Sequence, residues 1–365
     1  MTLSAMVLAA GEGTRMRSAR PKPLHLLCGR PMLLHVLSAL KGCDIDRTVV
    51  VVGHGAEAVT KKVQELGSSA LRIGFVEQLV QRGTGDAVLV GMTGFIDDDL
   101  DESGDLLVLP GDTPLLRCET VAALVAQHRE SGAAATLLTA RLADPTGYGR
   151  VGRDRNGNVA RVVEHGDATA EEREIDEVNT SIYCFRRDLL APALRRLSPE
   201  NSQGEYYLTD VVSVLHDAGY PVGSYVIADA VEVQGVNDRV QLAQAEAELR
   251  ARTNRDWLAA GVTMVDPAQT YVDVTVDLSP DVTLFPGTIL QGVTTIGPGA
   301  EIGPSTRLVD TKVGPGAVVA NTVARNAVIG ADCVVGPFAA LDPGAELAPG
   351  TRTGAFYTAP RSDES

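Results

Sequence analysis

The chain has 365 residues, of which 44% are hydrophobic and 22% are charged, so it is a globular protein long enough for two domains with a core each. Its formal net charge is −15. This acidity argues against a general nucleic-acid binder or an anionic-membrane binder, since both carry basic surfaces.

A glycine-containing loop follows the first apolar run, residues 6–10. Gly11 and Gly13 allow the backbone to come close to a ligand, so that successive N–H groups can point at phosphate oxygens. Arg15 and Lys22 add positive charge nearby. The loop lacks the Lys-Ser or Lys-Thr of a P-loop and the third glycine of the dinucleotide fingerprint, so it indicates either a polyphosphate loop or an ordinary strand-to-helix turn.

Short β-branched runs alternate with amphipathic segments from residue 1 to about residue 240. The predicted strands are residues 6–10, 47–52, 71–76, 105–109, 134–139 and 181–185. The predicted helices between them include residues 31–40, 56–65 and 120–131. This alternation predicts a Rossmann-like α/β domain with a mostly parallel sheet, helices on both faces, and ligands beyond the carboxyl ends of the strands.

Asp112 comes directly after the strongest of these buried strands. Its carboxylate would lie at the carboxyl end of that strand, where the first loop also opens. A carboxylate beside a polyphosphate is unfavourable unless a divalent cation lies between them, and Mg²⁺ takes protein oxygens together with substrate phosphates. Asp112 is therefore a candidate metal ligand, and the alternative is a turn-forming aspartate.

Two further groups of polar residues are candidates for binding a base and a sugar. The glycine-rich turn 81–85, preceded by Gln78, offers amide and backbone groups to a base, although such a turn is more often an ordinary loop. Gly149, Glu164 and Asn179 could hydrogen-bond a sugar, although a lone glutamate is usually a solvated surface charge.

The sequence changes character after residue 237. Asp238 is placed to cap a helix over residues 240–260 that Gly261 would end, which predicts a connecting helix at 238–261. Beyond it, apolar residues recur every sixth position, and the step shortens to five through Val313 and Val318. The other members are Leu284, Leu290, Ile296, Ile302, Leu308, Val323, Ile329, Val335, Leu341 and Leu347.

This six-residue period predicts a parallel β-helix of about four coils at residues 262–357, because each repeat supplies one short strand and three repeats complete a coil. Residues 358–365 are polar and are expected to be a disordered tail. A solenoid of this kind can stack side by side with other copies, so we expect a homotrimer formed through it.

The five cysteines and six histidines form no recognisable catalytic or metal-binding pattern. An odd number of scattered cysteines fits a reducing compartment. No apolar run is long enough for a signal peptide or a membrane span. We therefore expect a cytoplasmic protein without membrane insertion.

A series of motifs between residues 5 and 243 resembles those of one enzyme family. The motifs read LAAGEGTRM, PKPLH, GRPMLLHVL, RGTGDA, LPGDTPLL, PTGYGRV, VVEHGDAT, EVNTSIY, QGEYYLTDV and GVNDRVQLA. The family is that of bifunctional N-acetylglucosamine-1-phosphate uridyltransferase/glucosamine-1-phosphate acetyltransferases, which carry a left-handed β-helix after a connecting helix. The resemblance implies a nucleotidyltransferase domain at 1–237 and a truncated left-handed β-helix at 262–357.

The resemblance also implies a reaction and its residues. A phosphate oxygen of N-acetylglucosamine 1-phosphate would attack the α-phosphorus of UTP, with Mg²⁺ as cofactor and pyrophosphate as leaving group. Arg15 and Lys22 would stabilise the charge. UTP would contact Leu8, Ala9, Ala10, Gly11, Gly13, Thr14, Gln78, Gly83 and Thr84. The sugar would contact Gly149, Glu164, Asn179 and Asn237, and the metal would be held by Asp112 and Asn237.

The chain departs from the family's pattern at several positions. Asp86 stands where the base-side turn of the family has histidine, and Ser181 stands where the sugar-side motif has glycine. Either change could adjust substrate preference. Ala340 and Asp342 replace arginines, and the sequence stops at Ser365, before the family's catalytic histidine. We therefore expect acetyltransferase activity to be absent.

Two alternative functions are open from the sequence. The first is uridylyl or thymidylyl transfer to another sugar 1-phosphate, which would use the same first loop. The second is a non-catalytic sugar-nucleotide sensor or scaffold, against which the retained set of Arg15, Lys22, Asp112 and Asn237 speaks.

Overall fold

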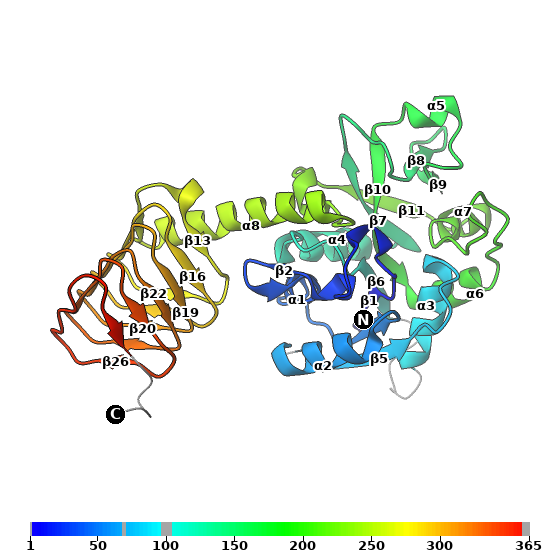
Figure 1. The fold of residues 1–365 in the computed structure, drawn as a ribbon. Coiled ribbons are helices and arrows are strands. Elements are labelled where there is room, and N and C mark those ends of the chain that lie inside the picture. Colours follow the sequence, from blue (N-terminus) through cyan, green and yellow to red (C-terminus); the bar gives the residue numbers. More distant parts are fainter. Residues whose placement is uncertain (1, 68–70, 96–103, 360–365) are drawn as a thin grey trace. The chain divides into compact units, whose positions relative to one another are not determined.

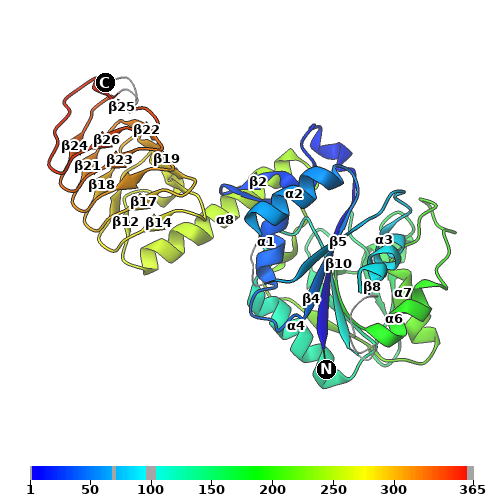
Figure 2. The same ribbon diagram turned by 90° about the horizontal axis from the view of Figure 1, so that it is seen from below.

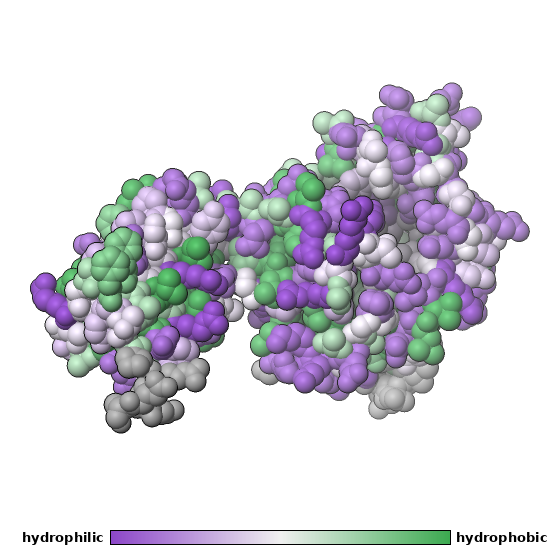
Figure 3. Space-filling view, in the orientation of Figure 1, coloured by the Kyte–Doolittle hydropathy of each residue, from purple (hydrophilic) through white to green (hydrophobic). Residues whose placement is uncertain are grey.

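The computed structural model describes residues 2–67, 71–95 and 104–359 and divides into two compact units (Figure 1). Unit 1 comprises Met1–His25 and Pro31–Gln241, and unit 2 comprises Leu26–Arg30 and Leu242–Ser365. Among the described residues, no helix is both long enough and apolar enough to cross a membrane. Hydrophilic residues cover most of the face of unit 1 seen in Figure 3.

Unit 1 is built on a nine-stranded sheet in the order β11-β7-β10-β6-β1-β4-β5, with β8 and β9 attached through β10. The strands are β1 (Leu3–Ala9), β4 (Arg47–Val52), β5 (Ile73–Glu77), β6 (Asp105–Pro110), β7 (Ala135–Arg141), β8 (Arg150–Arg153), β9 (Val159–Val163), β10 (Glu177–Arg186) and β11 (Val222–Val226). The mostly parallel sheet is confirmed, because β1 pairs in parallel with β4 and β6, β4 with β5, and β11 with β7. The exceptions are β10, which is antiparallel to β6 and β7, and the antiparallel pair β8 and β9.

Helices cover both faces of this sheet (Figure 2). One face carries α1 (Met32–Ala39), α2 (Ala56–Leu66) and α4 (Cys118–Ser131). The other carries α3 (Thr84–Met92), α6 (Arg187–Leu194) and α7 (Asp210–Asp217). Because successive side chains of a strand point to opposite faces, β1 contributes Val7 to the first core and Met6 to the second. The three predicted helices are α1, α2 and α4, and the helices of the second face were not predicted.

Shorter elements complete the chain. They are η1 (Thr14–Met16), η2 (Lys22–Leu24), β2 (Leu26–Leu27), β3 (Arg30–Pro31), η3 (Thr93–Phe95), α5 (Ala170–Arg173), η4 (Ala230–Val233) and η5 (Pro267–Gln269). The segment 26–30 belongs to unit 2, which the sequence did not predict. There the Cys28 N–H donates to the Glu246 carboxylate at 2.7 Å, and the Cys28 carbonyl accepts from Val274 N–H at 3.0 Å.

The predicted long helix is α8 (Arg239–Ala259). The Asp238 carboxylate accepts from the N–H groups of Val240 and Gln241 at 2.9 and 2.8 Å, as expected of an N-cap. At the other end Gly261 has φ +95°, and the Val262 N–H reaches back to the Trp257 carbonyl at 3.0 Å. The division between the two units falls within this helix, between Gln241 and Leu242.

Unit 2 is a left-handed parallel β-helix whose strands form three parallel sheets. The first sheet is β12 (Thr263–Met264), β15 (Thr283–Leu284), β18 (Glu301–Ile302), β21 (Val318–Val319) and β24 (Val334–Val335). The second is β13 (Tyr271–Val272), β16 (Ile289–Gln291), β19 (Arg307–Val309), β22 (Val323–Arg325), β25 (Ala340–Leu341) and β27 (Thr358–Ala359). The third is β14 (Asp277–Leu278), β17 (Thr295–Ile296), β20 (Lys312–Val313), β23 (Val328–Ile329) and β26 (Glu346–Leu347).

The inward-facing ladder of unit 2 differs from the prediction at two places. Val318 and Val323 were predicted to face inward, but Val323 is 58% exposed and the buried residues are the neighbours Val319 and Ala324. Since adjacent strand residues point to opposite sides, a one-residue shift in the step exchanges inside and outside. Both residues of each pair are apolar, so the sequence pattern could not decide between them.

The solenoid begins within the predicted range, which starts at residue 262, but its buried ladder begins before Leu284, and its last strand extends beyond residue 357. Met264, Val272 and Leu278 are buried in an additional first coil. This coil escaped the six-residue period because η5 lies between Met264 and Val272. At the far end, β27 pairs in parallel with β25, so the predicted disordered tail is wrong for Thr358–Ala359. The rest of that tail, residues 360–365, lies outside the described residues.

Candidate active site

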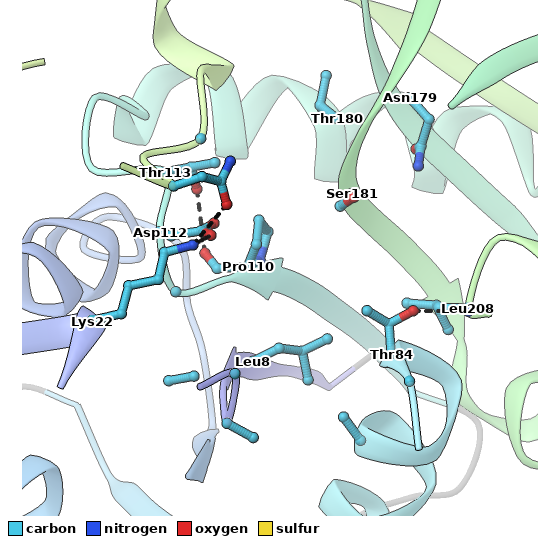
Figure 4. A pocket seen from close by; sticks show the side chains of 18 of the residues that line it. Leu8, Lys22, Thr84, Pro110, Asp112, Thr113, Asn179, Thr180, Ser181 and Leu208 are labelled. Carbon is cyan, nitrogen blue, oxygen red and sulfur yellow. Dashed lines mark hydrogen bonds and ion pairs between the residues drawn. The ribbon is translucent and has the colours of Figure 1, made fainter. Parts of the chain in front are cut away.

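A cavity of about 930 Å³ opens in unit 1 beyond the carboxyl ends of β1 and β6 (Figure 4). The predicted site residues that line it are Leu8, Ala9, Ala10, Gly11, Arg15, Lys22, Gln78, Gly83, Thr84, Asp112, Glu164, Asn179 and Asn237. Three other predicted residues, Gly13, Thr14 and Gly149, are not part of its lining. The cavity therefore brings together residues from the whole length of unit 1, at the edge where a parallel sheet binds ligands.

The two glycines of the first loop have different structural roles. Gly11 lines the cavity, and a Cβ built on it would meet no atom within 4 Å, so its backbone is open to a ligand. Gly13 has φ +64°, and a Cβ there would lie 2.6 Å from the Lys22 Cβ. Gly13 thus gives room to the Lys22 side chain instead of lining the cavity.

Two cations and two oxygen ligands meet at one side of the cavity. The Lys22 ammonium forms an ion pair with the Asp112 carboxylate (Figure 4). It also donates to Asn237 Oδ1 at 2.9 Å. Arg15 Nη2 donates to the same Oδ1 at 3.1 Å. A backbone hydrogen bond holds the segments of Asp112 and Asn237 together, because the Val236 N–H donates to the Asp112 carbonyl at 2.8 Å.

This cluster has the donor chemistry of a magnesium site. One carboxylate and one amide oxygen already converge on a single cation, the Lys22 ammonium, so Asp112 and Asn237 lie within reach of a common ion. Mg²⁺ prefers oxygen ligands and usually takes one or two from protein together with substrate phosphates. No group of three or more His, Cys, Asp or Glu side chains suited to a metal occurs in the described part of the chain. The residues present therefore fit a metal that is shared with a phosphate ligand.

The turn that holds the base-side residues is fixed by a second segment. Gly83 has φ +107°, and a Cβ on it would lie 2.6 Å from the Tyr206 carbonyl oxygen. The Gly85 N–H donates to that carbonyl at 2.8 Å, and Thr84 Oγ1 accepts from the Leu208 N–H at 3.0 Å. Thr84 thus acts as an anchor of this turn as well as part of the cavity wall.

Gln78 and Gln81 extend this wall. The Gln78 side chain is 4% exposed, and its Nε2 donates to Asp86 Oδ2 at 2.7 Å and, more weakly, to the Gly83 carbonyl at 3.4 Å. Gln81 Nε2 donates to the Ala10 carbonyl at 3.3 Å, which ties the turn to the first loop. None of these hydrogen bonds could be predicted from the sequence.

Glu164 also lines the cavity, and Thr209 Oγ1 donates to its Oε1 at 3.0 Å. Burial raises the pKa of this carboxyl, and the nearby Asp210 and Asp167 charges raise it further, although the hydrogen bond from Thr209 opposes the shift. A buried carboxylate of this kind gains from hydroxyl donors supplied by a ligand. Thr209, which also lines the cavity, was not predicted, although its motif QGEYYLTDV was among those quoted.

Asn179 offers an unused acceptor in the same region. Its Nδ2 donates to the Tyr183 hydroxyl at 2.7 Å, whereas its buried Oδ1 has no hydrogen-bond partner among the described residues. A buried acceptor without a partner is costly, so its presence in a cavity wall indicates a ligand donor. Gly149 is bonded to this residue through the backbone, because the Gly149 carbonyl accepts from the Asn179 N–H at 2.9 Å.

A bulge in β10 places Asn179 beside Ser181 (Figure 4). The pairing register of β10 with β7 shifts between Asn179 and Ile182, and Ser181 has φ +62°. This left-handed conformation favours glycine, which is the residue that the resembling family has at this position. Ser181 therefore keeps the bulge at the expense of some backbone strain.

Comparison with known proteins agrees with this geometry. The family model described as "MobA-like NTP transferase domain" matches residues 5–214, which include most of the cavity wall. The fold, the cavity and this match define the chain as a nucleotidyltransferase.

The chain is also similar to curated proteins named "Bifunctional protein GlmU". It is 50% identical to that of Thermobifida fusca over 327 residues, which is 90% of this chain and 67% of the relative. It is 48% identical to that of Streptomyces avermitilis (96% of this chain, 71% of the relative) and 43% identical to that of Halalkalibacterium halodurans (98% and 76%). The chain belongs to the family of the bifunctional GlmU proteins.

Proposed function

We propose that the protein transfers the uridylyl group of UTP to N-acetylglucosamine 1-phosphate, giving UDP-N-acetylglucosamine and pyrophosphate. The observation that carries this proposal is the convergence of Lys22, Arg15, Asp112 and Asn237 in a cavity whose wall includes an open glycine loop. Cations with oxygen ligands in one place suit a metal-bound triphosphate. Membership of the GlmU family makes uridylyl transfer the form of nucleotidyl transfer that we infer.

The reaction needs alignment and charge stabilisation more than acid–base chemistry. The attacking phosphate oxygen is already ionised at neutral pH, and the α-phosphorus of UTP accepts it as pyrophosphate leaves on the opposite side. Arg15 and Lys22 would hold the triphosphate and stabilise the charge that develops on it. Asp112 and Asn237 would hold Mg²⁺, which supplies further stabilisation of phosphate charge when bound.

The other walls of the cavity support the two substrates. Gln78 and Gly83 would contact the uracil base, beside Ala10 and Gly11. On the opposite side, the free Asn179 Oδ1 suits a donor such as the N–H of an acetamido group, and Glu164 suits sugar hydroxyls. An N-acetylhexosamine offers both kinds of donor, and membership of the GlmU family favours it over glucose 1-phosphate, whose hydroxyls offer only one kind.

A screen for pyrophosphate release tests this function. Nucleoside triphosphates are each combined with sugar 1-phosphates in the presence of Mg²⁺, and we expect the largest rate with UTP and N-acetylglucosamine 1-phosphate. A larger rate with dTTP or with glucose 1-phosphate would replace these substrates by the alternative pair. Absence of release from every pair would contradict the proposal and favour a sugar-nucleotide sensor.

Two further properties are inferred for the same chain. The curated relatives are named bifunctional, but Ala340 and Asp342, which are exposed in unit 2, offer no positive charge to an anionic acetyl carrier. We expect no acetyl transfer from acetyl-CoA to glucosamine 1-phosphate in a thiol-release assay, and any transfer would contradict this.

We also infer that the protein forms a homotrimer through unit 2, because the apolar side chains of Val293, Val323 and Phe338 are exposed there. Light scattering should then give three times the mass of one chain.

A further inference from the structure

Asp86 holds the amide of Gln78 in one orientation. Asp86 lies in the first turn of α3 and is not part of the cavity lining, whereas Gln78 lines the cavity and is almost completely buried. The bond from Gln78 Nε2 to Asp86 Oδ2 is 2.7 Å long. A carboxylate can only accept hydrogen bonds, so the atom of Gln78 that faces it must be the amide nitrogen.

The consequence is that Gln78 has only an acceptor left for a ligand. Both hydrogens of Nε2 are directed to protein oxygens, one to Asp86 and one to the Gly83 carbonyl. No hydrogen bond within the described residues reaches Gln78 Oε1. Without Asp86, only the weaker bond to the Gly83 carbonyl would oppose rotation of the amide by 180°, which exchanges the acceptor for a donor.

We propose that Asp86 is a positioning residue for base selection, which fixes Gln78 as an acceptor and so favours a base that presents an N–H group. This inference rests on the proposed function of the same site. Uracil and thymine carry a hydrogen on N3, which Gln78 Oε1 can accept. Cytosine has a lone pair on N3, so two acceptors would face each other, and one buried polar group would lose its partner.

The size of the preference for UTP over CTP follows from the hydrogen bond that cytosine cannot form. Sites that hydrogen-bond one substrate group reject analogues that lack it by factors on the order of 10⁴–10⁵ when the unpaired groups are fully buried. We expect the ratio of kcat/KM for UTP to that for CTP to fall on the order of tenfold to a hundredfold in Asp86→Ala. The change should come from a lower value for UTP and a higher one for CTP, because the released amide can turn its Nε2 toward cytosine N3.

Two further measurements separate selection from simple stabilisation of the helix. An acidic residue in a first turn also favours a helix through the helix dipole, and that role would lower stability while affecting both nucleotides equally. The ratio of UTP to dTTP should stay constant in Asp86→Ala, since both bases carry the N3 hydrogen. In Asp86→Asn the introduced amide can accept or donate, so the ratio of UTP to CTP should lie between those of Asp86→Ala and the unaltered protein.

Glu57→Ala is the matched control, because Glu57 is an exposed acidic residue in the first turn of α2. It should change neither ratio. If the ratio of kcat/KM for UTP to that for CTP is unchanged in Asp86→Ala while the unaltered protein is active on UTP, the role of Asp86 is overturned. The proposed function would then still stand. Absence of turnover in the unaltered protein with every nucleotide would overturn the proposed function instead.

Discussion

The coils of unit 2 and the cavity of unit 1 treat buried polar groups in opposite ways. In unit 2 the buried polar side chains of the coils are mostly threonines whose hydroxyls donate to backbone carbonyls, as Thr288 does to Ile302 at 3.0 Å and Thr306 to Val319 at 3.3 Å. No buried side-chain atom without a partner occurs in the described coil residues 263–359. Around the cavity of unit 1, by contrast, Asn179 Oδ1 is buried without a partner and Glu164 has a raised pKa.

This difference separates a part of the chain that is optimised for stability from one that is prepared for a ligand. The regular coils satisfy each polar group internally, so a ligand would gain little by binding within them. The cavity keeps polar groups incompletely satisfied, which costs folding free energy that a bound ligand can return. Substitutions around the cavity should therefore change activity more than stability, and substitutions in the coils the reverse.

The largest effect is expected from Asp112→Ala or Lys22→Ala. Either change removes a group that would stabilise phosphate charge, so turnover should fall on the order of 10²–10³-fold or more in an assay of pyrophosphate release. Their ion pair is partly exposed, with 13% and 27% exposed side chains, so its loss should change the free energy of unfolding by only about 0–1 kcal/mol. Lys62→Ala, which breaks the exposed pair with Glu65, should leave turnover unchanged. Near-normal turnover in either cavity variant would remove it from the proposed machinery.

Leu308→Ala should show the reverse pattern. Leu308 is fully buried in the solenoid, so its truncation should lower the free energy of unfolding of unit 2 by about 2–5 kcal/mol. Denaturation followed by hydrogen exchange in peptides of unit 2 measures this, and uridylyl turnover at 25 °C should remain close to normal. Val323→Ala, at a 58% exposed position, should be within about 0.5 kcal/mol of the unaltered protein. A loss of turnover without a loss of stability would contradict the division between the units.

Acid should remove the stability that Asp105 contributes to unit 1. Burial alone would raise the pKa of Asp105, but hydrogen bonds from His128 and Arg129 outweigh it and hold the pKa below its ordinary value. The stability that this group contributes is present above its unfolded pKa and is lost as pH falls through the folded pKa.

The pKa of Asp273 in unit 2 is shifted in the opposite direction from that of Asp105. Burial raises its pKa despite a hydrogen bond from the Gly292 N–H, so its contribution is present below the unfolded pKa and is lost as pH rises through the folded one. Hydrogen exchange during acidification should show β6 losing protection as pH falls through the folded pKa of Asp105. Asp105→Asn should flatten the pH dependence of unit 1, and an unchanged pH dependence would contradict the role of this group.

The smallest effects are expected from replacing a threonine by valine at one position in each unit. Thr306→Val removes a hydroxyl bonded to backbone and should cost about 1 kcal/mol of unfolding free energy in unit 2, with turnover unchanged. Thr209→Val removes the donor to Glu164, so the KM for the sugar phosphate should rise several-fold, which Thr306→Val should not do. An equal KM in the two variants would break the comparison.

Much of the architecture could be predicted because it depends on repeating patterns. Buried β-branched runs predict the central strands, and the six-residue period predicts the solenoid together with most of its inward residues. The prediction failed where two adjacent residues are both apolar, as at Val318 and Val319, because periodicity then does not decide which one faces inward. It also failed for β8 and β9, an antiparallel pair within a domain read as alternating strands and helices.

The site could be predicted as a set of residues but not as a set of contacts. Most residues suggested by the family resemblance line one cavity. The partners that hold them are distant in sequence, as Thr209 is from Glu164 and Asn237 is from Lys22. Long-range hydrogen bonds of this kind depend on the tertiary fold, so no local pattern indicates them.

The uneven steps of the solenoid ladder bear on how this part of the chain tolerates change in length. Leu284 and Ile302 are further apart in sequence than Val319 and Val335, yet each pair stands in register in the same sheet. The corners between strands absorb the difference, because the pairing of strands does not depend on the number of corner residues. Insertions and deletions of one residue should therefore be accepted at corners and rejected within strands, where they would turn the apolar ladder outward.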